Sequence, residues 1–305
     1  MPLNTDVGIH ADCHVDNHDR GFLANLEFPI RRYPYEGRER FNNILEMELQ
    51  RHQNAPAEDI SEWVLFTGVD KPTLVRDFLE PSTPWTDAGW SSFDASQCLL
   101  LASMPNSRPH EAAAAAFGNL FLDAVEPTGL KYALEDLRSA MFEGEDKGKQ
   151  PDNAWGPRRP PPGHDRYWPT VVTEIACSQT PSKLSSDVRY WLEGTDRKAQ
   201  AVVTLIIDQK APRITVEKWQ QQQNSRAHRA QKITISKMNE RTTVEGGSLV
   251  IGFQELFLRP SDAPKETDFE LGEQRLTLLA TIIWEQQEQE RELKELKKKK
   301  SGSRN

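Results

Sequence analysis

The chain lacks long apolar runs and contains few cysteines. Its 305 residues include only three cysteines, at positions 13, 98 and 177, and so sparse and odd a set provides no disulfide framework of the kind that stabilises small secreted domains. No stretch approaches the roughly 20 consecutive apolar residues that a membrane-spanning helix needs. The polar N-terminus also lacks the apolar segment of a secretory signal. These absences predict an intracellular protein that spans no membrane.

Positive charge is also scarce. The sequence holds 38 Lys and Arg against 46 Asp and Glu, a net charge of −8, whereas proteins that coat nucleic acid neutralise its phosphates with Lys and Arg. This balance argues against a dedicated nucleic-acid coat, but it does not exclude an enzyme with a local basic patch. The sequence carries no phosphate-binding P-loop, dinucleotide fingerprint, nucleophile elbow or zinc-protease helix. The His- and Asp-rich segment 10–18 lacks the paired spacing of a structural zinc site.

Composition divides the chain into four parts. Residues 1–30 are polar and predicted to be disordered, and residues 31–95 are predicted to form an extension of helices and loops. Residues 96–284 alternate between strand-like and helix-like patterns, which predicts an α/β core with mixed strand pairing. Residues 285–305 are predicted to form a charged helix with a basic tail.

Within the core, apolar periodicity marks the expected elements. Strand patterns lie at 97–104, 170–177, 201–207, 213–219, 231–237 and 248–257, and helix patterns lie at 110–125, 181–193 and 272–300. The continuous apolar run at 201–207 is typical of a strand inside a sheet that is covered on both faces.

Two carboxylates stand out against this background. Glu174 interrupts an apolar strand, and because an unpaired carboxylate is costly to bury, a metal ion or a cationic partner is expected beside it. Asp152 follows a proline in the preceding loop. If the loop folds back, both carboxylates can converge at strand ends and hold Mg²⁺, which takes one or two hard oxygen ligands from a protein. The alternatives are a turn formed by Asp152 with its own backbone and a Glu174 that faces solvent or pairs with a lysine.

Other polar residues are placed to reach the same point. Gln179 and Lys183 follow the strand of Glu174, and Asp187 lies one helical turn after Lys183. Glu111 opens the alanine-rich helix, where an acid also complements the helix N-terminus. A solvated helix face is the alternative interpretation of Asp187.

Four segments follow one another along the chain in a characteristic order. They are Leu99–Glu111, Lys149–Asp152, Pro169–Gln179 and Leu184–Leu192. In this order they resemble the PD-(D/E)XK restriction-endonuclease-like superfamily, and within it the Uma2-like branch together with uncharacterised relatives in filamentous fungi. The resemblance covers residues 80–285.

This resemblance implies a fold and an activity. The fold is a restriction-endonuclease-like mixed β-sheet flanked by helices, here with an N-terminal extension and a long C-terminal helix. The activity is nucleic-acid hydrolysis with Mg²⁺ or Mn²⁺, in which Asp152 and Glu174 bind the metal and Glu111 orients the metal or its waters. The family's lysine two residues after the glutamate is replaced by Ala176, so Gln179 or Lys183 would have to take its role.

The leading hypothesis is therefore a metal-dependent nuclease of mobile-element origin that acts on DNA rather than RNA. The alternative is a catalytically inactive descendant that binds nucleic acid or protein through the old cleft, which Ala176 and the acidic net charge favour. A third hypothesis assigns the function to the C-terminal helix as a coiled-coil partner, although Leu293 and Leu296 are its only apolar residues after Trp284. The oligomeric state stays open, with a homodimer as one candidate.

The basic tail offers a separate signal. The segment Lys294–Arg304 is rich in lysine and is typical of a nuclear-import signal or a phosphate-binding arm. It predicts nuclear accumulation, with a solubilising helix end as the alternative.

Overall fold

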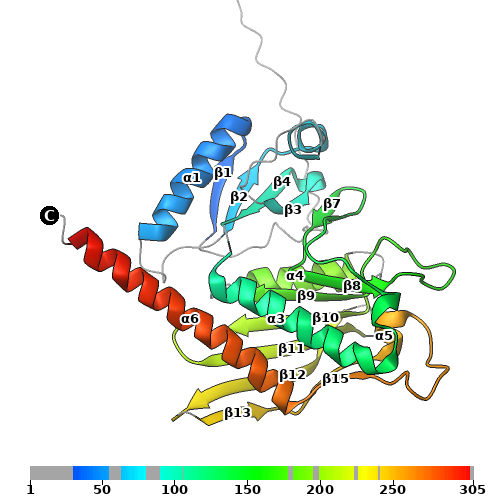
Figure 1. The fold of residues 1–305 in the computed structure, drawn as a ribbon. Helices are drawn as coiled ribbons and strands as arrows, with labels where there is room; N and C mark the ends of the chain where they lie inside the picture. Colours follow the sequence, from blue (N-terminus) through cyan, green and yellow to red (C-terminus); the bar gives the residue numbers. More distant parts are fainter. Residues whose placement is uncertain are drawn as a thin grey trace, which may run out of the picture.

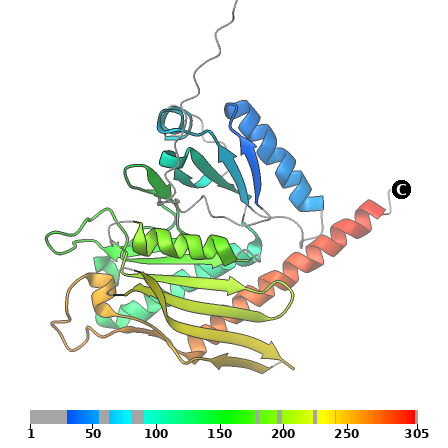
Figure 2. The ribbon, with the colours of Figure 1, turned by 180° about the vertical axis from the view of Figure 1, so that it is seen from behind.

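Two β-sheets, each packed against helices, make up the computed structural model of this protein (Figures 1 and 2). The structure describes residues 30–54, 63–79, 90–104, 106–177, 181–194, 199–222, 226–239 and 241–302. This mixed α/β architecture, with mixed sheets flanked by helices and a long C-terminal helix, confirms the predicted fold class. The segment 1–30 that was predicted to be disordered lies, except for Ile30, outside the described residues.

The larger sheet has seven strands in the order β13-β12-β11-β10-β9-β8-β5. Its strands are β5 (Leu134–Asp136), β8 (Asn153–Pro157), β9 (Val171–Ala176), β10 (Ala201–Ile207), β11 (Arg213–Gln221), β12 (Ala227–Met238) and β13 (Arg241–Glu245). All neighbours pair antiparallel except β9 and β10, which are parallel. A parallel pair needs a crossover connection, and helix α4 (Pro181–Glu193) supplies it.

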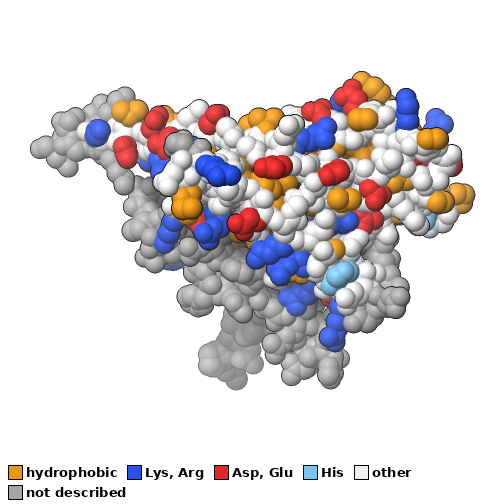
Figure 3. Space-filling model, turned by 90° about the horizontal axis from the view of Figure 1, so that it is seen from below, with side chains coloured by type: hydrophobic (Ala, Val, Ile, Leu, Met, Phe, Trp, Pro, Cys, Tyr) orange, Lys and Arg blue, Asp and Glu red, His pale blue; other side chains and the backbone are white. Residues whose placement is uncertain are grey.

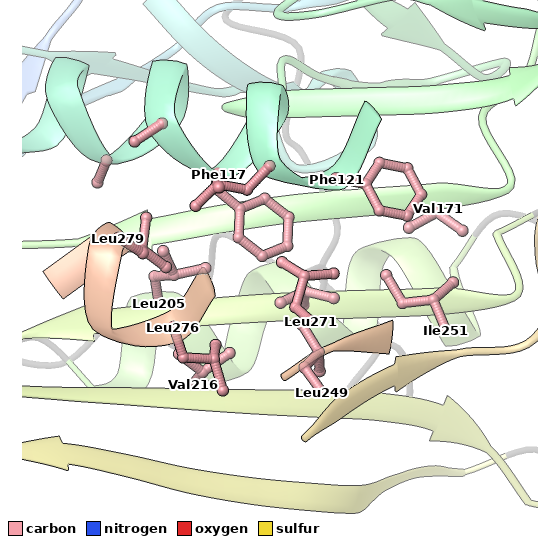
Figure 4. Packing of buried hydrophobic residues seen from close by; sticks show 14 of the residues in the cluster. Phe117, Phe121, Val171, Leu205, Val216, Leu249, Ile251, Leu271, Leu276 and Leu279 are labelled. Atoms are coloured by element: carbon pink, nitrogen blue, oxygen red, sulfur yellow. The ribbon is translucent and has the colours of Figure 1, made fainter. Parts of the chain in front are cut away.

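Helices cover both faces of this sheet. On one face lie α3 (Arg108–Val125) and the long α6 (Glu273–Gly302), together with the short α5 (Phe253–Phe257) and the strand pair β14 (Leu249–Ile251) and β15 (Phe269–Leu271). Figure 4 shows Phe117 of α3 pointing toward the sheet, Phe121 beside Val171 of β9, and Leu279 of α6 beside Leu205 of β10. Helix α4 packs on the opposite face. The apolar core therefore fixes β9 rigidly between two helical layers.

Helix α3 begins at Arg108, two residues before the predicted start at His110. The side chain of Ser107 accepts a hydrogen bond from the backbone N–H of His110, and Pro109 occupies the first turn, where a missing N–H costs nothing. The alanine run then brings the helix close to the sheet, and Asn153 of β8 donates a hydrogen bond to the carbonyl of Ala114. This arrangement places the first turn of α3 near the start of β8.

The smaller sheet has six strands in the order β1-β2-β4-β3-β7-β6. They are β1 (Arg31–Pro34), β2 (Trp63–Thr67), β3 (Trp90–Asp94), β4 (Leu99–Ser103), β6 (Phe142–Glu143) and β7 (Lys147–Lys149). Helix α1 (Arg38–Asn54) packs on this sheet, and the short α2 (Lys71–Leu74) continues into a π-helical turn, Val75–Leu79.

Two sequence predictions fail in this part of the chain and near its end. The prediction of helices and loops for residues 31–95 is wrong for β1, β2 and β3, and β3 pairs with β4 and β7 across the predicted boundary. These strands are only four or five residues long, too short to show a clear period of two. The predicted strand 248–257 is β14 followed by α5, because a short apolar run does not distinguish a strand from a buried helical turn.

Helix length and cysteine chemistry add two observations. None of the helices in the described ranges is long and apolar enough to cross a membrane. Cys177 is a buried free thiol.

Candidate active site

The structure brings Asp152 and Glu174 together at one end of the β8–β9 pair. Asn153 lies opposite Thr173 in this antiparallel pair, so Asp152, one residue before β8, lies opposite Glu174. The backbone N–H of Asp152 donates to the carbonyl of Thr173 at 3.1 Å, and one Asp152 carboxylate oxygen, Oδ2, accepts the N–H of Ile175 at 2.6 Å. Backbone contacts thus fix the two carboxylates relative to each other.

Glu174 lies in a buried cluster of charges that the two sheets enclose. Lys149, at the end of β7, places its Nζ 3.2 Å from Glu174 Oε1 and 3.0 Å from Asp187 Oδ1. Lys183 Nζ lies 2.5 Å from the same Asp187 oxygen. The indole N–H of Trp191 donates to Glu174 Oε1 at 2.5 Å. Each of these four charged residues is at most 4% exposed, so the charges are satisfied by one another rather than by water.

The smaller sheet completes this enclosure. Lys149 reaches the cluster from β7, and Lys183 of α4 lies 4.4 Å from the centre of the Trp63 ring on β2. A lysine at this distance over an aromatic face is attracted by the ring electrons, and more strongly when water is excluded. Trp63 and Lys183, more than a hundred residues apart in the sequence, therefore meet in the cluster that contains Glu174.

Burial decides the protonation of Glu174 and Lys183. Desolvation raises the pKa of Glu174 to about 8; Asp187 and Asp152 raise it too, while Lys149 and Lys183 act in the opposite direction. Desolvation likewise lowers the pKa of Lys183 despite its contact with Asp187. For Lys149, burial favours the neutral form, but Asp187 and then Glu174 outweigh it and raise the pKa. Lys149 therefore stays charged, and Asp187 is its main ionic partner.

Asp152 has a different cation beside it. His110 Nε2 lies 3.2 Å from Asp152 Oδ1. Burial favours the protonated carboxyl, but the charge and hydrogen bond of His110, with the N–H of Ile175, lower the pKa of Asp152. The Asp152 side chain is 21% exposed, which makes it the accessible carboxylate of the pair.

The predicted site residues separate into three groups. Asp152 and Glu174 meet, and Lys183 joins them through Asp187. Glu111 points away: its side chain is 66% exposed and accepts a hydrogen bond from Asn106 at 2.7 Å. Gln179 lies outside the described residues.

Sequence reasoning missed Lys149, His110 and Trp191. Lys149 stands three residues before Asp152 and His110 directly before Glu111. Both belonged to the segments that carry the family resemblance, so their positions were a usable signal. Trp191 has no signal in the sequence beyond its place on the apolar stripe of α4.

Replacing His110 with glutamine tests the pairing with Asp152. We expect the free energy of unfolding at pH 7 to fall by about 1–3 kcal/mol, because a hydrogen bond to an ionised group is lost. The lowered pKa of Asp152 stabilises the fold at pH values above its pKa in the unfolded chain, which is near 3.8. This stabilisation is lost as the pH falls through the pKa of Asp152 in the folded protein. The difference in stability between the variant and wild type should therefore shrink in acid. Urea unfolding at pH 7 and again below pH 3.8 measures it. The matched control is Glu111→Gln, an exposed neighbour expected to change stability by less than about 0.5 kcal/mol; equal losses in both variants would contradict the pairing.

Comparisons with known proteins add little to this geometry. No family model matches the sequence, and no curated protein matches it. Among solved structures, a crystal structure from Anabaena variabilis described as "a putative nuclease belonging to DUF820" aligns with 65% of this chain and 95% of that chain, at 15% identity and a TM-score of 0.38. Similarity at this level carries no argument, so the chemistry of the site rests on its own contacts.

Proposed function

We propose that the protein is a PD-(D/E)XK-like nuclease of the Uma2-like branch that hydrolyses phosphodiester bonds of nucleic acid with Mg²⁺ or Mn²⁺. The observation that carries the proposal is the position of Lys149, whose Nζ lies 3.2 Å from Glu174 Oε1. The lysine that is absent at position 176 is thereby supplied from β7. Asp152, Glu174 and Lys149 together form the acid–acid–lysine set that this chemistry needs.

The donor set supports a divalent metal at Asp152 and Glu174. Mg²⁺ binds one or two carboxylates and completes its shell with water and substrate phosphate. The described residues contain no group of three or more candidate ligands, so the protein would offer an ion only these two carboxylates. Asp152 is partly exposed, so its carboxylate is the one that a cation can approach. When bound, the ion would polarise the phosphate and lower the pKa of an attacking water.

The chain's own residues would act by position and charge. Lys149 keeps its proton because Asp187 and Glu174 raise its pKa; it is therefore an electrostatic stabiliser of negative charge on the phosphate and not a general base. Asp187 holds the Lys149 ammonium from the side opposite Glu174. Trp191 fixes the orientation of the Glu174 carboxylate through its indole N–H.

A second candidate function is a binding module without turnover. It is favoured by the composition of the buried cluster, in which two lysines face two carboxylates. Such a cluster is electrically balanced by its own members. In this case the site would be a structural remnant, and the protein would act through its surface.

The test is cleavage of DNA and RNA substrates with Mg²⁺ or Mn²⁺ by wild type and Asp152→Asn. We expect wild type to cleave and the variant to lose at least about 100-fold in rate, since even the outer partners of metal ligands contribute about 10–100-fold. The control is Asp123→Asn, an exposed carboxylate on α3, which should cleave like wild type. Absence of cleavage by folded wild-type protein with all substrates and both metals would overturn the nuclease proposal and favour the binding module.

We further propose that this activity is intracellular, with the basic tail 294–304 as a nuclear-import signal.

A further inference from the structure

Beyond the candidate active site, the seven-stranded sheet exposes a polar surface on the same side as Glu174. In β11 and β12, Ile214, Val216, Ile233 and Ile235 are fully buried against the layer of α3 and α6. Because side chains alternate along a strand, their neighbours point to the other side. We define the polar sheet face as Arg213, Thr215, Glu217, Lys232, Thr234, Ser236, Arg241, Thr243 and Glu245.

Helix α4 leaves this region uncovered. The helix starts near Glu174, where Lys183 and Asp187 lie, and its last turn reaches the far end of β11, where Gln221 donates to the carbonyl of Leu192. Arg213, Lys232 and Thr243 are exposed, whereas Thr215, Thr234 and Ser236 are half-buried. The polar sheet face thus lies at the end of the sheet that carries Glu174, beyond the cover of α4.

The strand register connects the face to the site. Glu174 pairs with Thr204, Thr204 with Glu217, and Glu217 with Lys232, in one row across β9, β10, β11 and β12. Adjacent strands are about 4.8 Å apart, so Lys232 lies on the order of 14 Å from Glu174 on the same side of the sheet. Thr204 and Glu217 between them are buried, so an extended polymer that contacts Lys232 lies within a few repeating units of Glu174 without touching it along this row.

The chemistry of the face fits an anionic backbone. Arg213, Lys232 and Arg241 form no ion pair with any described residue, although Arg229 pairs with Glu217 at 2.8 Å. The Ser236 and Thr243 hydroxyls lie 3.1 Å apart on neighbouring strands. Figure 3, which looks from the β12–β13 side, shows Lys and Arg side chains interspersed with Asp and Glu side chains on this side of the molecule. On a chain of net charge −8, the three cations of this face, Arg213, Lys232 and Arg241, outnumber its two carboxylates, Glu217 and Glu245. Cations and hydroxyls of this kind contact nucleic-acid phosphates.

We propose that the polar sheet face binds the sugar–phosphate backbone of nucleic acid, without reading its bases, and guides it toward Glu174. The guiding role rests on the proposed nuclease function, whereas the binding itself does not. No groove-reading element is needed, because Lys, Arg, Ser and Thr contacts to phosphates carry no sequence information.

The test is binding of short labelled single- and double-stranded oligonucleotides to the full chain in EDTA, followed by fluorescence anisotropy. We expect Lys232→Glu to weaken binding about 5- to 10-fold for all sequences and to reduce the salt slope, measured between about 50 and 200 mM, by about 1. The control is Lys265→Glu, an equal charge reversal at an exposed lysine between α5 and β15, expected to change binding less than about twofold. Thermal melting verifies that both variants fold.

The outcomes separate this proposal from the nuclease proposal. Weaker binding by Lys232→Glu but not by Lys265→Glu supports the face even if wild type cleaves nothing. Equal binding by both variants, or no binding by wild type, overturns it. A second copy of the chain is the competing occupant: a wild-type dimer that Lys232→Glu converts to monomer in sedimentation, without loss of oligonucleotide binding, would assign the surface to self-association and also overturn the proposal.

Discussion

Replacing Lys149 with methionine is expected to lower the free energy of unfolding by about 3–5 kcal/mol, since removal of one partner leaves buried charges uncompensated. Lys149 is 1% exposed and lies between Glu174 and Asp187. Its loss leaves Lys183 as the remaining cation of the cluster. Denaturant unfolding followed by tryptophan fluorescence measures the effect, because Trp191 contacts Glu174 directly.

Two further variants identify the cause. Lys131→Met removes a lysine whose side chain is 29% exposed and whose partners, Asp123 and Glu126, are themselves exposed; its cost should stay below about 1 kcal/mol. The double variant Lys149→Met/Glu174→Gln also removes the carboxyl group that loses its partner, and it should be more stable than the sum of the two single effects predicts. If the double variant loses the sum of the two single effects, Lys149 and Glu174 are not coupled in the way the geometry implies.

The fold and part of the site follow from patterns that are local in the sequence. The apolar run of β10 and the proline-initiated α4 are read from consecutive residues, and their order predicts a parallel pair with a helical crossover. Glu174 is recognisable because it interrupts an apolar strand, a position where a charge needs a partner. Asp152 is recognisable through its place in an ordered set of segments.

The partner of Glu174 was not predictable in the same way. Lys149 reaches it from the smaller sheet, and β7 is only three residues long, too short for any periodicity. The helix residue that meets Asp152 depends on the rotation of α3 about its axis. Adjacent helical positions point about 100° apart, so His110 faces the site while Glu111 faces solvent. Packing of α3 against β8, and not the sequence of the first turn, decides between them.

Glu174→Gln is expected to remove a pH dependence of stability that wild type shows in metal-free buffer. The folded protein holds the Glu174 proton up to about pH 8, whereas the unfolded chain releases it near the ordinary glutamate pKa of 4.5. Between these values the folded state binds more protons, so wild-type stability falls as the pH rises, by up to about 1.4 kcal/mol per pH unit from this group. Glutamine does not titrate, and the variant should therefore gain stability relative to wild type across this window.

Urea unfolding of both proteins between pH 5 and pH 8 measures the difference directly, in steps that define its slope. Glu135→Gln on β5, a half-buried glutamate outside the cluster, serves as the control. Its stability should change with pH in parallel with that of wild type.

Repeating the series with Mg²⁺ tests the metal proposal independently of turnover. Because a cation that binds the ionised Glu174 competes with its proton, added metal should flatten the plot of wild-type stability against pH and leave that of Glu174→Gln unchanged. Parallel curves for wild type and Glu174→Gln without metal would show that Glu174 is already ionised at pH 5, with Lys149 as a full ionic partner. An unchanged wild-type curve with metal would count against the binding of a metal ion at this carboxylate.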